Sequence, residues 1–504
     1  MIENISYPTN EVELDKGLGH AFEDGLYPNG WVLAEKGEIP LPPAFQRLFV
    51  RTEFLGKTLL IRKDADYVKR GSIVVIGHIF HLEKPLCGLE ETVEFLSLAV
   101  AQSEDRLLSE LEVCNGNFVL FYIQQEELII LTDATGMSSV FYDEQYMLAG
   151  SNASLLASVL SSGLTVRVID IPHKFGFPGN FTPFVGVKAL NPGCCLVLGH
   201  GVVRYQLLRA PPALEYNEVL DEFFFLLRTS FTAFGSRRNL LMSLTAGLDS
   251  RSALVGSSSL NKAKYFTYYR DDGVDTDAAD VCIASYIARK LGLDHRIVNL
   301  RKVGVPAEYA VVCRLNSHYR HIISASYNYY RLWKGADLFH VRSNLAEIGR
   351  SFYSFKLRTD RPVSPSVKNA LRFYVGDKIR RDESYSERLE EIYRAMMSVY
   401  LDESRFVDVD TSYDFRDVFY WEHRMGMWHS QVVAESNAAF DSLSAYNCPR
   451  ILKLMLMVSL EGRREKRLFR DLLKQHCPEL YSVPINPGRE VLEGFRRRVS
   501  LGYI

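Results

Sequence analysis

The fold is decided by the stretch Leu240-Leu241-Met242-Ser243-Leu244-Thr245-Ala246-Gly247-Leu248-Asp249-Ser250-Arg251. An apolar run passes into small hydroxyl and glycine residues, and helix-forming residues follow. This order is typical of a buried parallel strand, a tight loop and the first turn of a helix. Such a loop directs backbone N–H groups and hydroxyls at one place, beside a helix N-terminus that favours negative charge. The stretch therefore predicts a phosphate site, and Asp249 within it indicates a metal ion bridging to the phosphates. The alternative is an ordinary strand-to-helix turn in which Asp249 caps the helix.

Length and composition favour a multidomain globular protein. The chain has 504 residues, a net charge of −2 and 47% hydrophobic residues. Two or more domains are expected at this length. The near-neutral net charge lacks the positive excess that is typical of nucleic-acid-binding proteins. The basic run Arg496–Arg498 is interpreted as a solvated tail. Apolar runs are too short to span a bilayer, and the segment Met1–Ile5 lacks the pattern of a secretion signal.

The eight cysteines are scattered and form no CxxC pair. We interpret them as buried, reduced thiols, which together with the missing secretion signal predicts a cytoplasmic protein.

Residues 1–208 are predicted to form an α+β sandwich domain. The pattern indicates strands over 72–77, 117–122, 128–132 and 147–151, helices over 88–111 and 153–160, and a closing hairpin over 195–205. Runs of strands with few helices favour packed layers. The stretch Arg209-Ala210-Pro211-Pro212-Ala213 has the composition of a linker.

Residues 215–504 are predicted to form a doubly wound parallel sheet followed by a helical C-terminal part. After a helix that begins at Tyr216, strands are expected over 240–244, 264–269, 294–298 and 337–341, with a crossover helix over 277–291. Ligands of such sheets bind beyond the carboxyl ends of the strands. The loop Thr245–Ser250 lies at that position.

The loop Thr245–Ser250 resembles the Ser-Gly-Gly-x-Asp-Ser pyrophosphatase loop of ATP-dependent adenylating enzymes. More narrowly, the whole chain resembles the asparagine synthetase superfamily, which includes β-lactam synthetases and lasso-peptide cyclases. The resemblance implies a glutaminase-type, Ntn-hydrolase-like N-terminal domain. Its further landmarks are Cys114–Phe118, Asp133–Gly136, Phe141-Tyr142, Gly186–Gly193, Arg204-Tyr205, Ala284–Gly292, His295 and Glu465–Arg470.

Two departures from the family pattern concern chemistry. Family glutaminases place a cysteine directly after the initiator Met, whereas this chain has Ile2. Without that nucleophile the N-terminal domain is predicted to be an inactive lid or scaffold. The amine would then come from a substrate or from free ammonia.

The second departure lies in Arg342–Arg350, where the family has a Gly-x-Gly-x-Asp-Glu loop. The preferred alignment gives Glu347 the magnesium role and places Asn344 where a catalytic Glu or Tyr usually stands. An ungapped alignment puts Ala346 at the metal position instead. Glu347 is also open to pairing with Arg342 or Arg350. The family's later acid aligns with Asn447.

The resemblance implies ATP and Mg²⁺ as cofactors. The metal ligands would be Asp249 and Glu347, and the catalytic groups Lys466, Arg470, Arg489 and Asn344. The basic residues of 466–470 are alternatively a solvated helix face, and His295 is interpreted as structural. Nucleotide contacts are expected from Leu241, Met242, Ser243, Thr245, Ala246, Gly247, Asp249, Ser250, Phe266 and Thr267.

The predicted function is an ATP- and Mg²⁺-dependent amide ligase of specialised-metabolite or peptide biosynthesis. It would activate a small-molecule or peptide carboxylate as an acyl-adenylate and join it to an amine that glutamine does not supply. The alternatives are an ammonia-dependent asparagine synthetase and a catalytically inactive scaffold subunit. No nucleic-acid or membrane partner is expected, and a homodimer is left open. The aromatic residues of 319–333 either pack a helix or line a hydrophobic acceptor pocket.

Overall fold

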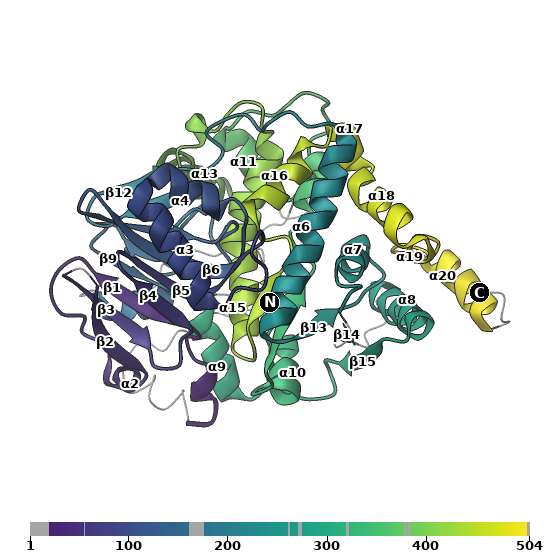
Figure 1. The fold of residues 1–504 in the computed structure, drawn as a ribbon, viewed down its shortest axis with the longest axis horizontal. Coiled ribbons are helices and arrows are strands. Elements are labelled where there is room, and N and C mark those ends of the chain that lie inside the picture. The colour runs from purple at the N-terminus through teal and green to yellow at the C-terminus, as the bar shows by residue number, and fades with distance from the viewer. Residues whose placement is uncertain are drawn as a thin grey trace.

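A computed structural model describes residues 20–54, 56–160, 176–260, 263–270, 275–318, 322–376, 380–381 and 385–500. Figure 1 shows a strand-rich N-terminal part, purple to blue, beside a C-terminal part in which helices surround a smaller sheet. Helices α18–α20 extend from that part as an arm.

The N-terminal part contains two antiparallel six-stranded sheets. The first sheet has the spatial order β10 (Val187–Ala189), β8 (Phe141–Asp143), β9 (Leu148–Gly150), β1 (Trp31–Ala34), β3 (Lys57–Arg62), β2 (Phe49–Phe54). The second has the order β12 (Gly201–Arg204), β11 (Cys194–Val197), β7 (Glu127–Thr132), β6 (Cys114–Gln124), β5 (Ile73–His81), β4 (Tyr67–Arg70).

Alternating side chains of β5 are buried on opposite faces of the second sheet. Val74 and Ile76 point into the core between the sheets, and Ile73 and Val75 point to the opposite face, beneath α3 and α4. The predicted helix 88–111 is wrong as a single element, because the chain forms α3 (Leu89–Gln102) and α4 (Glu104–Leu111). Ser103 between them is extended, and its hydroxyl accepts the Arg106 N–H at 3.1 Å as a helix cap.

The outer face of the first sheet is covered by helices from both parts of the chain. α5 (Ala153–Val159) and α9 (Ala307–Asn316) share one apolar cluster with Val32 and Leu60 of this sheet. The short helices α2 (Pro43–Gln46) and His20–Gly25 lie at its margin. The predicted α+β sandwich is therefore confirmed.

The C-terminal part is built on a five-stranded parallel sheet. Its order is β15 (Asp294–Asn299), β14 (Lys264–Tyr269), β13 (Asn239–Ser243), β16 (Leu338–Arg342), β17 (Ser442–Ser444). One face packs against α6 (Tyr216–Arg237), α7 (Leu248–Gly256) and α8 (Asp275–Leu291), and the other against α10 (Ile323–Trp333). Helices on both faces confirm the predicted doubly wound sheet. Sequence reasoning missed β17, which has only three residues.

Helices make up most of the remaining chain, as predicted. They are α11 (Val367–Tyr374), α13 (Glu387–Glu403), α14 (Phe415–Phe419), a π-helix (Tyr420–His429), α15 (Ser430–Asn437), α16 (Pro449–Met457), α17 (Leu460–Arg464), α18 (Arg467–His476), α19 (Pro478–Tyr481) and α20 (Arg489–Ser500). Among the described residues, none of the helices combines the length and apolar character needed to cross a bilayer. All eight cysteines are free thiols.

The two parts meet in a large interface that uses several of the landmark residues. β12 ends at Arg204 and α6 begins at Tyr216, on either side of the predicted linker. Asn447 binds Asp133, Thr135 and the β6 residues Gly116 and Asn117 at 2.7–3.1 Å. Asn447, the residue predicted to align with the family's later acid, therefore links the two parts by hydrogen bonds.

A buried ion pair joins the hairpin β11–β12 to the π-helix. The Arg204 guanidinium donates to both Glu422 carboxylate oxygens at 2.8 and 2.9 Å, and each side chain is only 1% exposed. Gly193 packs so closely that a Cβ there would lie 2.4 Å from a Glu422 oxygen. This explains the glycine that ends the landmark Gly186–Gly193.

Candidate active site

The predicted site lies where the strand order of the parallel sheet reverses. β13 pairs with β14 on one side and with β16 on the other. The loop after β13 leads into α7, and the loop after β16 leads to the 3-10 helix Ile348–Arg350. Both loops begin at carboxyl ends of adjacent parallel strands, which is the usual ligand position in such folds.

The first loop is held by its own hydroxyls. The hydroxyls of Thr245 and Ser250 share a hydrogen bond of 2.9 Å. The Thr245 N–H donates to Ser250 Oγ, and the Gly247 N–H donates to Thr245 Oγ1, both at 3.1 Å. The small hydroxyl residues of the motif therefore shape the turn before any ligand arrives.

Charged side chains fix the middle of this loop. The Ala246 N–H donates to the Asp280 carboxylate of α8 at 2.7 Å, and the Ala246 carbonyl accepts from Arg251 and from the Asn486 N–H, both at 3.0 Å. Burial lowers the pKa of Arg251 to about 10. Its guanidinium also donates to the carbonyls of Leu480, Val483 and Pro484. These hydrogen bonds hold residues 480–486 against the loop.

The two predicted metal ligands share one guanidinium. Arg350 Nη2 lies 2.7 Å from Asp249 Oδ2 and 3.7 Å from Glu347 Oε1. Asp249 Oδ1 and Glu347 Oε2 are buried and find no hydrogen-bond partner among the described residues. Burial raises the pKa of Asp249 to about 7, opposed by Arg350 and assisted by Glu347. Of the pairing alternatives for Glu347, the structure contains the one with Arg350.

A short turn places Glu347 and Arg350 on one side of the chain. They stand three residues apart around the 3-10 helix Ile348–Arg350, in which positions i and i+3 eclipse. Leu345 precedes this turn with a φ of 84° and is fully buried. Ala346, which the ungapped alignment puts at the metal position, is also fully buried in the apolar core, and its methyl group has no donor atom for a metal ion.

Lys466 belongs to the same electrostatic cluster. It stands at the start of α18 with a φ of 60°. Burial lowers its pKa, as do the positive charges of Arg350 and Arg470, whereas Asp249 raises it. Lys466 therefore interacts electrostatically with Asp249, and Arg470 with Lys466; the catalytic roles of Lys466 and Arg470 stay predictions. Arg489 does not join them, because its side chain is 77% exposed and pairs with Glu493 on the surface of α20.

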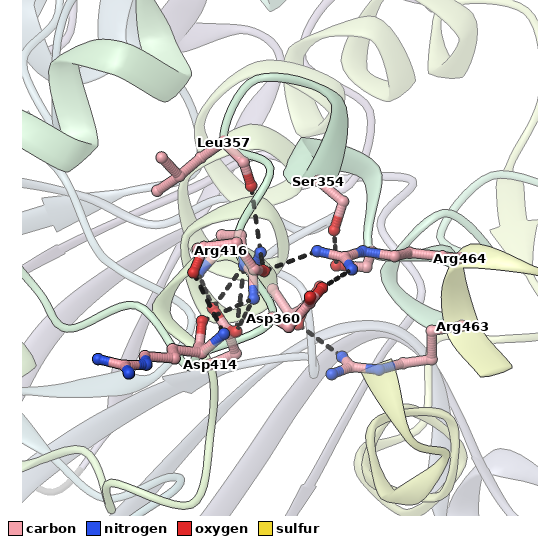
Figure 2. A network of polar contacts seen from close by, with 11 residues as sticks. Ser354, Leu357, Asp360, Asp414, Arg416, Arg463 and Arg464 are labelled. Atoms are coloured by element: carbon pink, nitrogen blue, oxygen red, sulfur yellow. Dashed lines mark hydrogen bonds and ion pairs between the residues drawn. The ribbon is translucent and has the colours of Figure 1, made fainter. Parts of the chain in front are cut away.

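Figure 2 shows a network of polar contacts that includes Arg416, Arg463 and Arg464. The fully buried Arg416 pairs with Asp414 and donates to the carbonyls of Leu357 and Thr359. Arg464 pairs with Asp360 at 2.5 Å. The network joins the segment that follows Arg350 to α17, which ends two residues before Lys466.

Asn344 and Tyr446 lie in the turns that follow the neighbouring strands β16 and β17. The Asn344 carbonyl accepts from Ser444 Oγ at 2.9 Å, and its side-chain oxygen accepts from Arg342 Nε at 3.3 Å. Tyr446 was not predicted, although it stands beside Asn447 in the sequence. Its hydroxyl donates to the Asp249 carbonyl at 3.3 Å.

The strand residues predicted to contact the nucleotide lie in the parallel sheet, and most of them are buried. Leu241 and Met242 point to opposite faces of β13, and Phe266 packs on the face covered by α10. Thr267 Oγ1 donates to the Leu244 carbonyl at 2.6 Å and contacts His295 at 2.8 Å, which fits a structural role for this histidine. Ser243, which is partly exposed, is the most accessible of these residues. Nucleotide contact by all of them stays a prediction.

The aromatic residues of α10 pack between layers. Tyr329 and Trp333 lie against Phe266, and Tyr327 and Tyr330 contact Tyr309 of α9. These contacts correspond to the helix-packing interpretation. Tyr319, like Ile2, lies outside the described residues.

The carboxylate oxygens of Asp249 and Glu347 include two that could bind a cation and two that already face an arginine. Two buried carboxylate oxygens without partners are ligands that Mg²⁺ prefers. The other oxygens of the same pair already face the Arg350 guanidinium. The assignment of Asp249 and Glu347 as metal ligands therefore stays a prediction.

Comparisons with known proteins return weak likenesses. No family model matches the chain, and no curated protein does. Among solved structures, NMN synthetase from Francisella tularensis is 13% identical, with 44% of this chain and 97% of that chain covered and a TM-score of 0.21. The NH3-dependent NAD synthetase from Campylobacter jejuni is 9% identical, with 38% and 96% covered and a TM-score of 0.20. Glutamine phosphoribosylpyrophosphate amidotransferase from B. subtilis is 10% identical, with 68% and 76% covered and a TM-score of 0.21. TM-scores this low establish neither fold nor function for this chain.

Proposed function

We propose that this chain is an ATP-dependent ligase that activates a substrate carboxylate as an acyl-adenylate and joins it to an amine that glutamine does not supply. The observation that carries the proposal is the meeting of the Thr245–Ser250 loop, Asp249 and Lys466 at the switch point of a parallel sheet. The motif resemblance to the asparagine synthetase superfamily supports the same reaction class.

The reaction has two displacements. A carboxylate oxygen attacks the α-phosphorus of ATP, and the bond to pyrophosphate breaks. An amine nitrogen then attacks the acyl carbon, AMP leaves and the nitrogen loses a proton. Lys466 and Arg470 would offset the charge of the departing pyrophosphate, and the hydroxyls of Thr245 and Ser250 would orient the phosphates. Mg²⁺, when bound with ATP, would neutralise phosphate charge, held by Asp249 and Glu347.

Carboxylate-dependent ATP–pyrophosphate exchange tests this proposal. Full-length protein is screened with amino acids, peptides and other small carboxylic acids. Asp249→Asn and Lys466→Met should each lower the exchange rate by about 10²-fold or more, as expected for the loss of a charge that acts on the transition state. Asp105→Asn, on the exposed surface of α4, is the matched control and should not change the rate. Equal pyrophosphate release by wild type and Asp249→Asn across the screen would contradict the proposal. Aspartate with ammonium as the substrate pair separates an asparagine synthetase from other ligases.

A second candidate function is that of an inactive binding or scaffold subunit. It is favoured by the internal partners of the site, because Asp280 already accepts the Ala246 N–H and Arg350 already faces both acidic residues. A scaffold subunit would bind nucleotide without exchange for any carboxylate. Calorimetric ATP binding, measured beside the exchange assay, distinguishes the two candidates.

A further inference from the structure

We propose that Arg350 is the resident cation of the switch point, taking the place of a divalent metal ion between Asp249 and Glu347 in the nucleotide-free protein. In the proposed function, Mg²⁺ that binds with ATP would have to displace this guanidinium from the two acids. The proposal rests on that function for its meaning in catalysis, but its test requires no turnover.

The first support is the contact geometry. One nitrogen of Arg350 is within hydrogen-bonding distance of Asp249, at 2.7 Å, and within ion-pair distance of Glu347, at 3.7 Å. A guanidinium at these distances supplies positive charge at the place where the two carboxylates converge. A divalent ion bound by both acids would have to displace it.

The second support is that the backbone holds Arg350 in place. Its N–H donates to the Glu347 carbonyl at 3.1 Å, which closes the 3-10 turn. Gly349 packs against Met455, where a Cβ would lie 2.9 Å from the sulfur. Ser351 follows in the left-handed region, with a φ of 44°. Movement of the guanidinium away from the acids therefore requires the side chain, not the turn, to rearrange.

The third support is charge. The side chains of Arg350, Asp249 and Glu347 are each about one-fifth exposed, so solvent screens them only in part. An arginine guanidinium does not lose its proton in proteins. The guanidinium therefore stays charged and repels a second cation. When it is removed, two acids face each other, each with a buried oxygen that has no hydrogen-bond partner in the part of the chain that the structure describes.

Divalent-cation binding to the nucleotide-free, full-length protein tests the proposal. The probe is Mn²⁺, followed by the paramagnetic resonance signal of the free ion. Arg350→Gln should bind one Mn²⁺ at least about tenfold more tightly than wild type, because a repelling charge next to the carboxylates is gone. Arg350→Lys keeps the charge and should bind Mn²⁺ as weakly as wild type.

Two variants locate the new site. Adding Glu347→Gln to Arg350→Gln should return the Mn²⁺ affinity to that of wild type. Arg342→Gln is the matched control, because Arg342 lies in the same loop but binds Asn344 and Ser436 instead of the acids. Its Mn²⁺ affinity should equal that of wild type. Tight stoichiometric binding to wild type would overturn the proposal even if Arg350→Gln failed to fold. An increase in Mn²⁺ affinity that persists in the double variant Arg350→Gln, Glu347→Gln would also overturn the proposal. Neither result depends on whether the chain proves to be a ligase.

Discussion

The buried pair Arg204–Glu422 offers a direct measure of how strongly the two parts of the chain are joined. We expect Glu422→Gln to lower the free energy of unfolding by about 3–5 kcal/mol, because it leaves the Arg204 guanidinium charged and buried. Burial alone would lower the pKa of Arg204, and the Glu422 carboxylate more than reverses this. Two hydrogen bonds to a charged partner, each worth about 1.5–3 kcal/mol, give a similar magnitude.

Urea unfolding followed by both circular dichroism and tryptophan fluorescence measures this loss. Coincident transitions of the two probes justify a two-state analysis. Glu390→Gln is the control, since its pair with Arg394 on α13 is exposed and should contribute only about 0.3–0.5 kcal/mol. If the losses for Glu422→Gln and Glu390→Gln were equal, the pair would not have the role that its burial indicates.

Two further predictions concern other polar contacts. Burial alone would raise the pKa of Asp441, but His78 and Arg238 hold it below its usual range, so its contribution to stability is present above about pH 4 and is lost as the pH falls further. The unfolding free energy of Asp441→Asn should therefore fall less steeply on acidification below pH ~4 than that of wild type, and parallel curves would refute this assignment. Arg416→Met removes the guanidinium that pairs with Asp414 and donates to the Leu357 and Thr359 carbonyls, so trypsin should cleave the adjoining segment faster, as read by mass spectrometry. Unchanged cleavage there would show that Arg416 does not hold it.

Much of the fold was predictable because its patterns are local. The strand Lys264–Tyr269 was predicted with its observed bounds, and Gly292, with a φ of 65°, ends α8 as expected. The break at Ser103 was missed because the apolar spacing continues across it. β17 was missed since three residues give no periodicity, and its strand conformation depends on pairing with β16.

The candidate site was predictable where a motif marks it and not where distant segments meet. The loop Thr245–Ser250 and Lys466 could be placed near one another by resemblance alone. The contact of Asp280 with Ala246 depends on how α8 packs, which no spacing in the sequence encodes. Arg350 was visible only as one of two arginines near Glu347, and the 3-10 turn decides between them. The exposure of Arg489 and its pair with Glu493 depend on the course of α20, which its sequence spacing does not encode.

The attachment of Asn447 has a consequence for how this gene can evolve. Its side chain is fully buried, and its described hydrogen-bond partners all come from the N-terminal part. A chain that lost that part would expose this amide and the apolar surface around it. Selection on the C-terminal half alone therefore preserves the N-terminal half. We expect the two halves to be inherited together and to resist separation into independent genes.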